Sequence, residues 1–186
     1  MHRRKQGGKF VLSKLKKMEV QETIAFIGGA GKNCPVLMKK MAQGNLRLLF
    51  LYNEEEKVQD FVEQLKEGQN EAEIEVVNCV KESCWEADII AFVDPGAIEE
   101  ELLRKIKEVA TQKILLLITT EHKDNTSSFV CRISDLEKEL PFSKIVSVKV
   151  DSQGMKAELS AKDPEALETV AEVMGKAGYE AVYKNS

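Results

Sequence analysis

Short apolar runs alternate with amphipathic stretches along most of the chain. A run of consecutive apolar residues is typical of a strand buried on both faces, whereas apolar residues spaced at i, i+3, i+4 and i+7 are typical of a helix. By these criteria we predict strands at 24–27, 46–52, 74–77, 89–93, 114–118, 146–150, 157–161 and 179–183.

The stretches between these strands supply the helices. Pro35 and Pro164 stand where a first helical turn tolerates proline, and Asp163 is a suitable N-cap. The spacing predicts helices over 34–43, 58–67, 98–109, 129–140 and 164–177. Cys79 and Cys84 are predicted to lie on a short connection, with Trp85 packed at the edge of the sheet.

Strands that alternate with helices indicate an α/β fold with a Rossmann-type, doubly wound, mostly parallel sheet. The chain has 186 residues, and residues 21–186 are predicted to form a single domain of this kind. No apolar run approaches the roughly 20 residues of a membrane-spanning helix, so we expect a soluble protein with no membrane partner. Four cysteines without a C-x-x-C pair, and only two histidines, argue against a metal site and indicate a reducing, cytoplasmic location.

Charge is distributed unevenly along the sequence. Residues 1–20 hold seven of the 27 Lys and Arg residues but only one of the 31 Asp and Glu residues, so the rest of the chain carries a net charge of −10. Such an acidic body is a poor nucleic-acid binder. The basic residues 1–20 are predicted to be a disordered extension, either a tail or a segment upstream of a start at Met18.

A glycine-rich segment follows the first predicted strand. In a doubly wound sheet, ligands bind beyond the carboxyl ends of the strands, beside the first strand. Gly29-x-Gly31-x-x-Cys34 matches the dinucleotide fingerprint, with cysteine in place of its third glycine. The two glycines permit a tight turn and a close approach of backbone N–H groups to a pyrophosphate. The alternative is a tight turn that binds nothing.

A P-loop does not fit the same residues. That motif requires glycine where Phe26 stands and Ser or Thr where Asn33 stands. Nucleoside triphosphatase activity is therefore not expected.

Three short motifs carry a family resemblance. They are Ile27-Gly28-Gly29-Ala30-Gly31, Ala87-Asp88-Ile89-Ile90 followed by Pro95, and Ala177-Gly178-Tyr179. With their surroundings (23–61, 87–119 and 144–183) they resemble the NADP oxidoreductases that depend on the deazaflavin coenzyme F-420, a family related to pyrroline-5-carboxylate reductases and to the 6-phosphogluconate dehydrogenase group.

The resemblance implies an NAD(P)-binding domain with the cofactor phosphates on the glycine loop. It also implies that Asp94-Pro95 lies against the ribose and nicotinamide. Together with the second strand's end, these segments give the predicted cofactor-binding residues Gly29, Ala30, Gly31, Lys32, Asn33, Cys34, Asn53, Glu54, Val93, Asp94 and Pro95.

The chain departs from this family at several positions. Asn53-Glu54 stands where NADP-using relatives place an arginine pair, so NAD is slightly favoured over NADP. No helical substrate or dimerisation region follows Ser186, so the walls of a substrate site would have to come from loops or from a second subunit in a homodimer. His122 is a weak candidate proton donor, and no catalytic residue is assigned.

Two functions are compatible with these observations. The first is an NAD(P)-dependent oxidoreductase that transfers a hydride between nicotinamide and an unidentified acceptor, with a deazaflavin among the candidates. The second is a non-catalytic dinucleotide sensor or interaction domain that lacks the substrate half.

Residues 1–17 should be dispensable for stability, because they precede the first predicted strand and contain few apolar residues. A variant that begins at Met18 should melt within about 2 °C of the full chain in a thermal unfolding experiment. A much larger loss would mean that these residues dock on the body of the protein.

Overall fold

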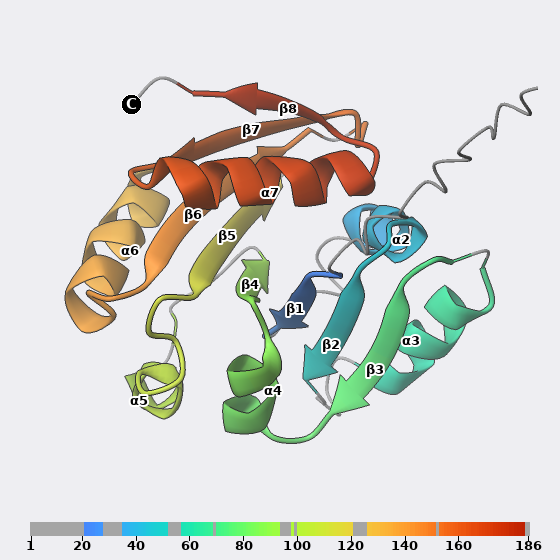
Figure 1. Cartoon of the computed structure of the whole chain (residues 1–186), viewed down its shortest axis with the longest axis horizontal. Coiled ribbons are helices and arrows are strands. Elements are labelled where there is room, and N and C mark those ends of the chain that lie inside the picture. The colour runs from blue at the N-terminus through green and yellow to red at the C-terminus, as the bar shows by residue number, and fades with distance from the viewer. Residues whose placement is uncertain are drawn as a thin grey trace, which may run out of the picture.

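The structure is a computed structural model, and it describes residues 21–27, 35–51, 57–68, 70–93, 98, 100–120, 126–151 and 153–184, with the backbone alone in 126–132. These residues form an eight-stranded sheet in the order β3-β2-β1-β4-β5-β6-β7-β8 (Figure 1). The strands are β1 (Thr23–Phe26), β2 (Arg47–Leu51), β3 (Glu73–Val77), β4 (Ile89–Val93), β5 (Ile114–Thr120), β6 (Lys144–Val150), β7 (Lys156–Ala161) and β8 (Glu180–Tyr183).

The sheet is mostly parallel, as the sequence predicts. Strands β1 to β6 run in one direction, β7 pairs antiparallel with β6, and β8 pairs parallel with β7. The Rossmann-type α/β class is therefore confirmed. Strand β3 ends the sheet on one side, and β8 ends it on the other.

Helices cover the sheet on both faces. One face packs against α2 (Pro35–Gln43), α3 (Val58–Lys66) and α7 (Pro164–Lys176), whose apolar residues share the main core with β1 to β7. The opposite face packs against α4 (Val80–Glu86), α5 (Glu100–Ile106) and α6 (Thr126–Glu139). Among the described residues, no helix is both long enough and apolar enough to cross a bilayer.

The short connection predicted around Cys79 and Cys84 is wrong, because this segment contains α4. Cys79 is the exposed N-cap residue, and Cys84 is fully buried in the core on that face. Trp85 does not pack at the sheet edge as predicted, since 70% of its surface is exposed. The helix has seven residues and buries only Ser83 and Cys84, so its sequence carries almost no apolar periodicity.

The start of α7 follows its sequence signals. The carboxylate of Asp163 accepts a hydrogen bond from the backbone N–H of Ala166 at 2.8 Å, and Pro164 occupies the first turn. Lys144 lies 3.3 Å from the carboxylates of both Asp163 and Glu165. The Ala166 N–H, and after it the Lys144 ammonium, hold the pKa of Asp163 below its ordinary value.

Two substitutions of Asp163 should separate the stability that comes from its N-cap hydrogen bond from the stability that comes from its negative charge. Asp163→Ala leaves the N–H of Ala166 without its acceptor and should lower the melting temperature by about 2–4 °C. Asp163→Asn keeps an acceptor and should cost less. Because the pKa is lowered in the folded state, the advantage of wild type over Asp163→Asn should be present near neutral pH and disappear as the pH falls through the folded pKa. Equal melting temperatures for all three proteins at pH 7 would contradict this role.

Candidate functional site

Three neighbouring strands end at the same edge of the sheet. In the registers of β1 with β2 and β4, Phe26 lies opposite both Phe50 and Ala91. Adjacent strands are about 4.8 Å apart, so the ends of β2, β1 and β4 lie within about 10 Å of one another. The chain adds β2 and β3 on one side of β1 and then adds β4, β5 and β6 on the other. This reversal is the switch point at which α/β sheets bind ligands.

The residue that precedes the glycine-rich segment is held firmly. Ile27 donates its backbone N–H to the carbonyl oxygen of Ala91 at 3.0 Å. Its side chain is 7% exposed and packs in the core on the α4–α6 face. The path of the chain is thus fixed up to the point where Gly28 begins.

The other end of the same segment is anchored by α2. Leu37, Met38 and Met41 are fully buried in the main core. The ammonium of Lys40 lies 4.6 Å from the centre of the Tyr179 ring and donates to the carbonyl of Gly178, which ties α2 to the turn before β8. Gly178 has a φ of +75°, so this turn uses glycine for its backbone conformation, as the predicted end of the last helix requires.

Most residues of the predicted site lie outside the described residues. Among the predicted cofactor-binding residues the structure describes Val93, whose side chain is 4% exposed and packs in the main core at the end of β4. The predicted residues that it does not describe are Gly29, Ala30, Gly31, Lys32, Asn33, Cys34, Asn53, Glu54, Asp94 and Pro95, and His122 is not described either.

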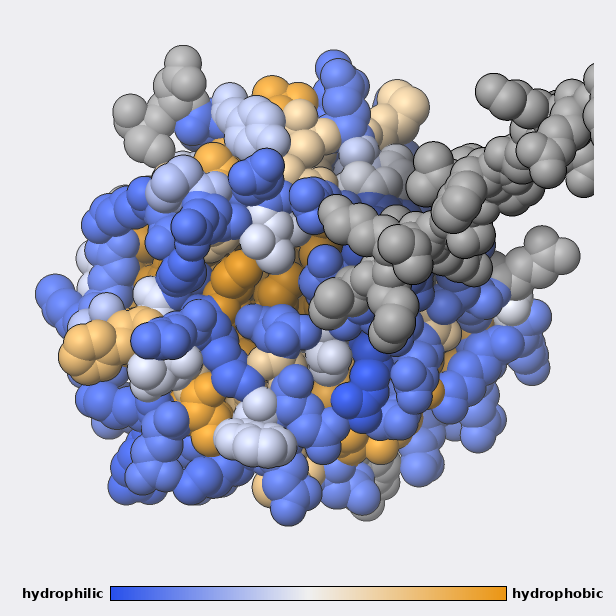
Figure 2. Space-filling view, viewed as in Figure 1, coloured by the Kyte–Doolittle hydropathy of each residue, from blue (hydrophilic) through white to orange (hydrophobic). Residues whose placement is uncertain are grey.

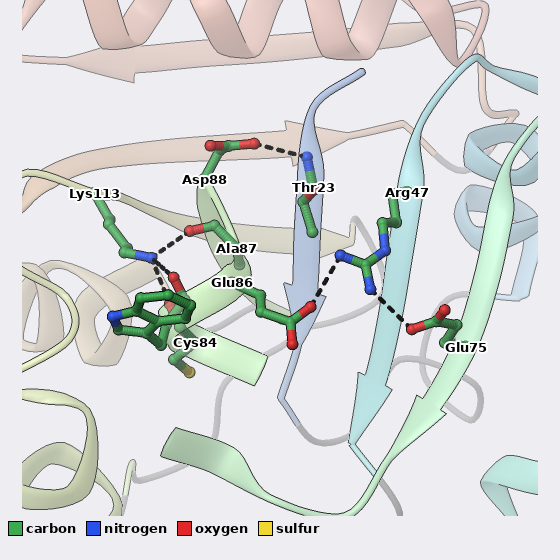
Figure 3. A network of polar contacts seen from close by, with 9 residues as sticks. Thr23, Arg47, Glu75, Cys84, Glu86, Ala87, Asp88 and Lys113 are labelled. Carbon is green, nitrogen blue, oxygen red and sulfur yellow. Dashed lines mark hydrogen bonds and ion pairs between the residues drawn. The ribbon is translucent and has the colours of Figure 1, made fainter. Parts of the chain in front are cut away.

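At the amino ends of the parallel strands, opposite the candidate site, a polar network joins the first strands (Figure 3). Asp88 accepts a hydrogen bond from the backbone N–H of Thr23 at 2.9 Å, and its own N–H donates to the carbonyl of Thr23. Arg47 forms ion pairs with Glu75 at 3.0 Å and with Glu86 at 2.9 Å. Asp88 and Arg47 therefore hold the amino ends of the strands together, and neither faces the predicted cofactor edge.

Lys113 is a second anchor at this amino-terminal edge that the sequence did not reveal. Its ammonium donates to the carbonyls of Cys84, Trp85 and Ala87 at 2.8, 2.5 and 2.6 Å, where α4 ends and β4 approaches (Figure 3). A cation is favourable at a helix C-terminus. Burial lowers the pKa of Lys113, and burial also raises the pKa of the Cys84 thiol to about 12. Cys84 is therefore an unreactive core residue.

The structure also has a cavity of about 370 Å³ at the amino-terminal edge. Its walls include Trp85, Gln112, Lys113, Lys144 and Glu165. Lys113 and Lys144 are already bonded to carbonyls and carboxylates, so this cavity offers no free cation to a ligand. Within the described segments, no three His, Cys, Asp or Glu side chains come together as metal ligands would.

The fold has many relatives among solved structures, although no family model and no curated protein matches the sequence. One is 5-formyl-3-hydroxy-2-methylpyridine 4-carboxylic acid 5-dehydrogenase, an NAD+ dependent dismutase (TM-score 0.66, 14% identity, covering 89% of this chain and 58% of that one). Another is pyrroline carboxylate reductase from Plasmodium falciparum with NADP bound (TM-score 0.56, 16% identity, 90% and 59%). A third is the N-terminal domain of HmdIII from Methanocaldococcus jannaschii (TM-score 0.64, 10% identity, 89% and 100%).

These similarities define the class of the domain as a Rossmann-type fold. The chain spans less than two thirds of the length of the dehydrogenase and of the reductase, but it matches the whole of the HmdIII domain. The predicted relation to pyrroline-5-carboxylate reductases is supported at the level of the fold, and the solved structures do not confirm a dependence on a deazaflavin.

Proposed function

We propose that this protein binds a nicotinamide dinucleotide at the carboxyl edge of β2, β1 and β4 and acts as an oxidoreductase. The observation that carries the proposal is the strand order at the switch point, with a Gly-x-Gly segment that begins two residues after the buried Ile27. The NAD+ dependent dismutase and the NADP-bound reductase that share the fold support the same assignment.

Backbone groups would make most of the contacts to the cofactor. The segment Gly29–Cys34 leads into α2, and N–H groups at the start of a helix favour the negative charge of a pyrophosphate. Asn53 and Glu54 follow β2 and are proposed to bind the adenosine ribose. Val93 is buried, so its contact would come from the main chain, with Asp94 and Pro95 beyond it near the second ribose.

When bound, the nicotinamide would supply the chemistry of hydride transfer. The chain's own contribution would be to orient the ring and to exclude water around it. The acceptor or donor is unidentified, and a deazaflavin remains one candidate class. A cytoplasmic location is part of the proposal, in keeping with the free thiols of Cys79 and Cys84.

The second candidate is a dinucleotide-binding sensor or interaction domain without turnover of its own. The match to the HmdIII domain along its whole length is compatible with this candidate, because that domain has the fold without the further part that the dehydrogenase and the reductase contain.

Calorimetric titrations with NAD+, NADH, NADP+ and NADPH test the shared part of both candidates. Saturable binding of one pair supports the proposal, and the absence of binding by all four contradicts it. An oxidation screen over small imines, flavins and deazaflavins then separates the two candidates, because the sensor binds the cofactor without consuming it.

Gly31→Val should abolish binding while the protein stays folded. The branched side chain would fill the space through which a pyrophosphate approaches the backbone. Gly175→Val is a matched control, because a Cβ at Gly175 on α7 meets nothing within 4 Å. Both variants should keep the circular dichroism spectrum of wild type. Unchanged affinity in Gly31→Val would mean that the glycine segment is only a turn.

If a dinucleotide binds, the protein should prefer NAD(H) to NADP(H). A 2′-phosphate would bring negative charge to the end of β2, where Glu54, Glu55 and Glu56 follow. Two unit charges 4 Å apart interact by about 1 kcal/mol in water and about 4 kcal/mol at an effective dielectric constant of 20. Arg47 cannot compensate, because it is paired with Glu75 and Glu86 at the other end of β2. A tenfold preference, about 1.4 kcal/mol, is therefore expected.

Paired titrations of wild type and Glu54→Arg with both cofactors measure this preference. Glu54→Arg should shift it toward NADP(H), and Glu67→Arg, which makes the same charge change at the far end of α3, should leave it unchanged. Tighter NADP(H) binding by wild type would overturn the prediction and would indicate a phosphate clamp formed by Lys57 and Lys32.

A further inference from the structure

Strand β8 presents an open edge at one rim of the sheet. It pairs with β7, and no other described strand pairs with its outer side. The N–H groups of Glu180 and Lys184 donate to the carbonyls of Met155 and Leu159, both at 2.8 Å. Main-chain groups alternate in direction along a strand, so those of Ala181 and Tyr183 point away from β7. The outer edge of β8 therefore offers four main-chain groups to a further strand.

The side chains of β8 also alternate between two faces. Ala181 and Tyr183 pair with the buried Ala157 and Leu159, so they lie on the face covered by α7. The other face carries Glu180 and Val182, and Lys184 continues the same alternation. Val182 is 39% exposed and Tyr183 is 57% exposed.

An exposed strand edge with apolar side chains is a template for pairing with another chain. Figure 2 shows apolar side chains at the surface of the upper rim, over β8. The side chains of Glu180 and Lys184 flank this apolar area, and both are exposed. Neither one forms an ion pair with another residue of the described segments.

We propose that β8 pairs antiparallel with β8 of a second copy of this chain, about a two-fold axis at Val182. In this register Val182 meets the partner's Val182, and Ala181 meets the partner's Tyr183. The outward groups of Ala181 and Tyr183 then form four main-chain hydrogen bonds across the axis, two on each side. The sheet becomes continuous through both copies, and the open edges of both β8 strands are removed.

The side chains select this register because the strand is complementary to itself. Glu180 lies opposite the partner's Lys184, and Lys184 lies opposite the partner's Glu180, so two pairs of opposite charges flank the valines. On the other face, each Tyr183 ring lies against a small alanine.

Other registers lose these features. A slip of one residue places residues whose main-chain groups point to the partner opposite residues whose main-chain groups point to β7. It also places side chains of one sheet face opposite side chains of the other face. Centring the axis on Ala181 sets Glu180 against Val182, and centring it on Tyr183 sets Lys184 against Val182. Only the axis at Val182 keeps the hydrogen bonds and pairs both sets of charges.

Such an interface is small, because each copy contributes one short strand. We expect reversible association in the micromolar range, in the class of weak protein–protein contacts. The proposal is independent of cofactor binding, since β8 lies at the opposite rim of the sheet from β2 and β3 and four strands away from β4.

Sedimentation equilibrium of the full chain across this concentration range tests the proposal. Glu180→Lys sets a second ammonium against the partner's Lys184, and Lys184→Glu places two acids together. Each single reversal should weaken the dimer roughly tenfold or more. The double variant, Glu180→Lys with Lys184→Glu, exchanges the charges and should return to within about threefold of wild type.

An equimolar mixture of the two single variants is the sharpest measurement. Both charge pairs are complementary in the mixed dimer and repulsive in each homodimer, so the mixture should associate more tightly than either variant alone. Glu73→Lys, an exposed charge reversal on the other edge strand, is the matched control and should behave as wild type. Circular dichroism spectra establish that every variant is folded.

Three results would overturn the proposal. One is a monomer at every concentration. Another is a dimer that is insensitive to the reversals at Glu180 and Lys184. The third is a dimer that Glu73→Lys weakens, which would indicate pairing of β3 with β8 instead.

Discussion

The pairing of β1 with β4 is the contact on which the remaining elements depend, because the chain there changes the side on which it adds strands. β1 has four residues, yet it is held to β4 at both ends. At its amino end, Thr23 and Asp88 exchange two hydrogen bonds, and beyond its carboxyl end Ile27 donates to Ala91. Because β1 lies between the two halves of the sheet, its position determines where the ligand-binding crevice of a doubly wound fold opens.

Much of this arrangement could be predicted from apolar patterning. Strands such as β4 and β5 are covered on both faces, so their sequences are continuous apolar runs. Helix α4 could not be found in this way, because it is short and buries only two residues. The antiparallel direction of β7 could have been predicted from the length of the connection before it. Residues 151–155 are too few for a crossover, so β6 and β7 must form a hairpin.

The position of the candidate site is still a prediction from the sequence, whereas the side-chain contacts at the amino ends of the strands could not be predicted. The predicted place follows from the glycines after β1, which are local in sequence, and from the alternation of strands with helices, which indicates a doubly wound sheet. The roles of Asp88 and Lys113 depend on partners 65 and 26–29 residues away, and no local pattern encodes them. Val93 shows the same limitation, because a strand covered on both faces gives no sign of whether its last residue turns toward the core or toward a ligand.

The reversal of direction at β7 determines where the chain leaves the sheet. Because β8 runs parallel to β7, it begins at the carboxyl edge of the main strands and ends at their amino edge. Lys184 therefore lies on the side of Asp88 and Lys113, a full strand length from the carboxyl edge. A label, a surface tether or a fused domain attached after β8 would start from that remote side, and the carboxyl edge would stay open to small molecules from solution.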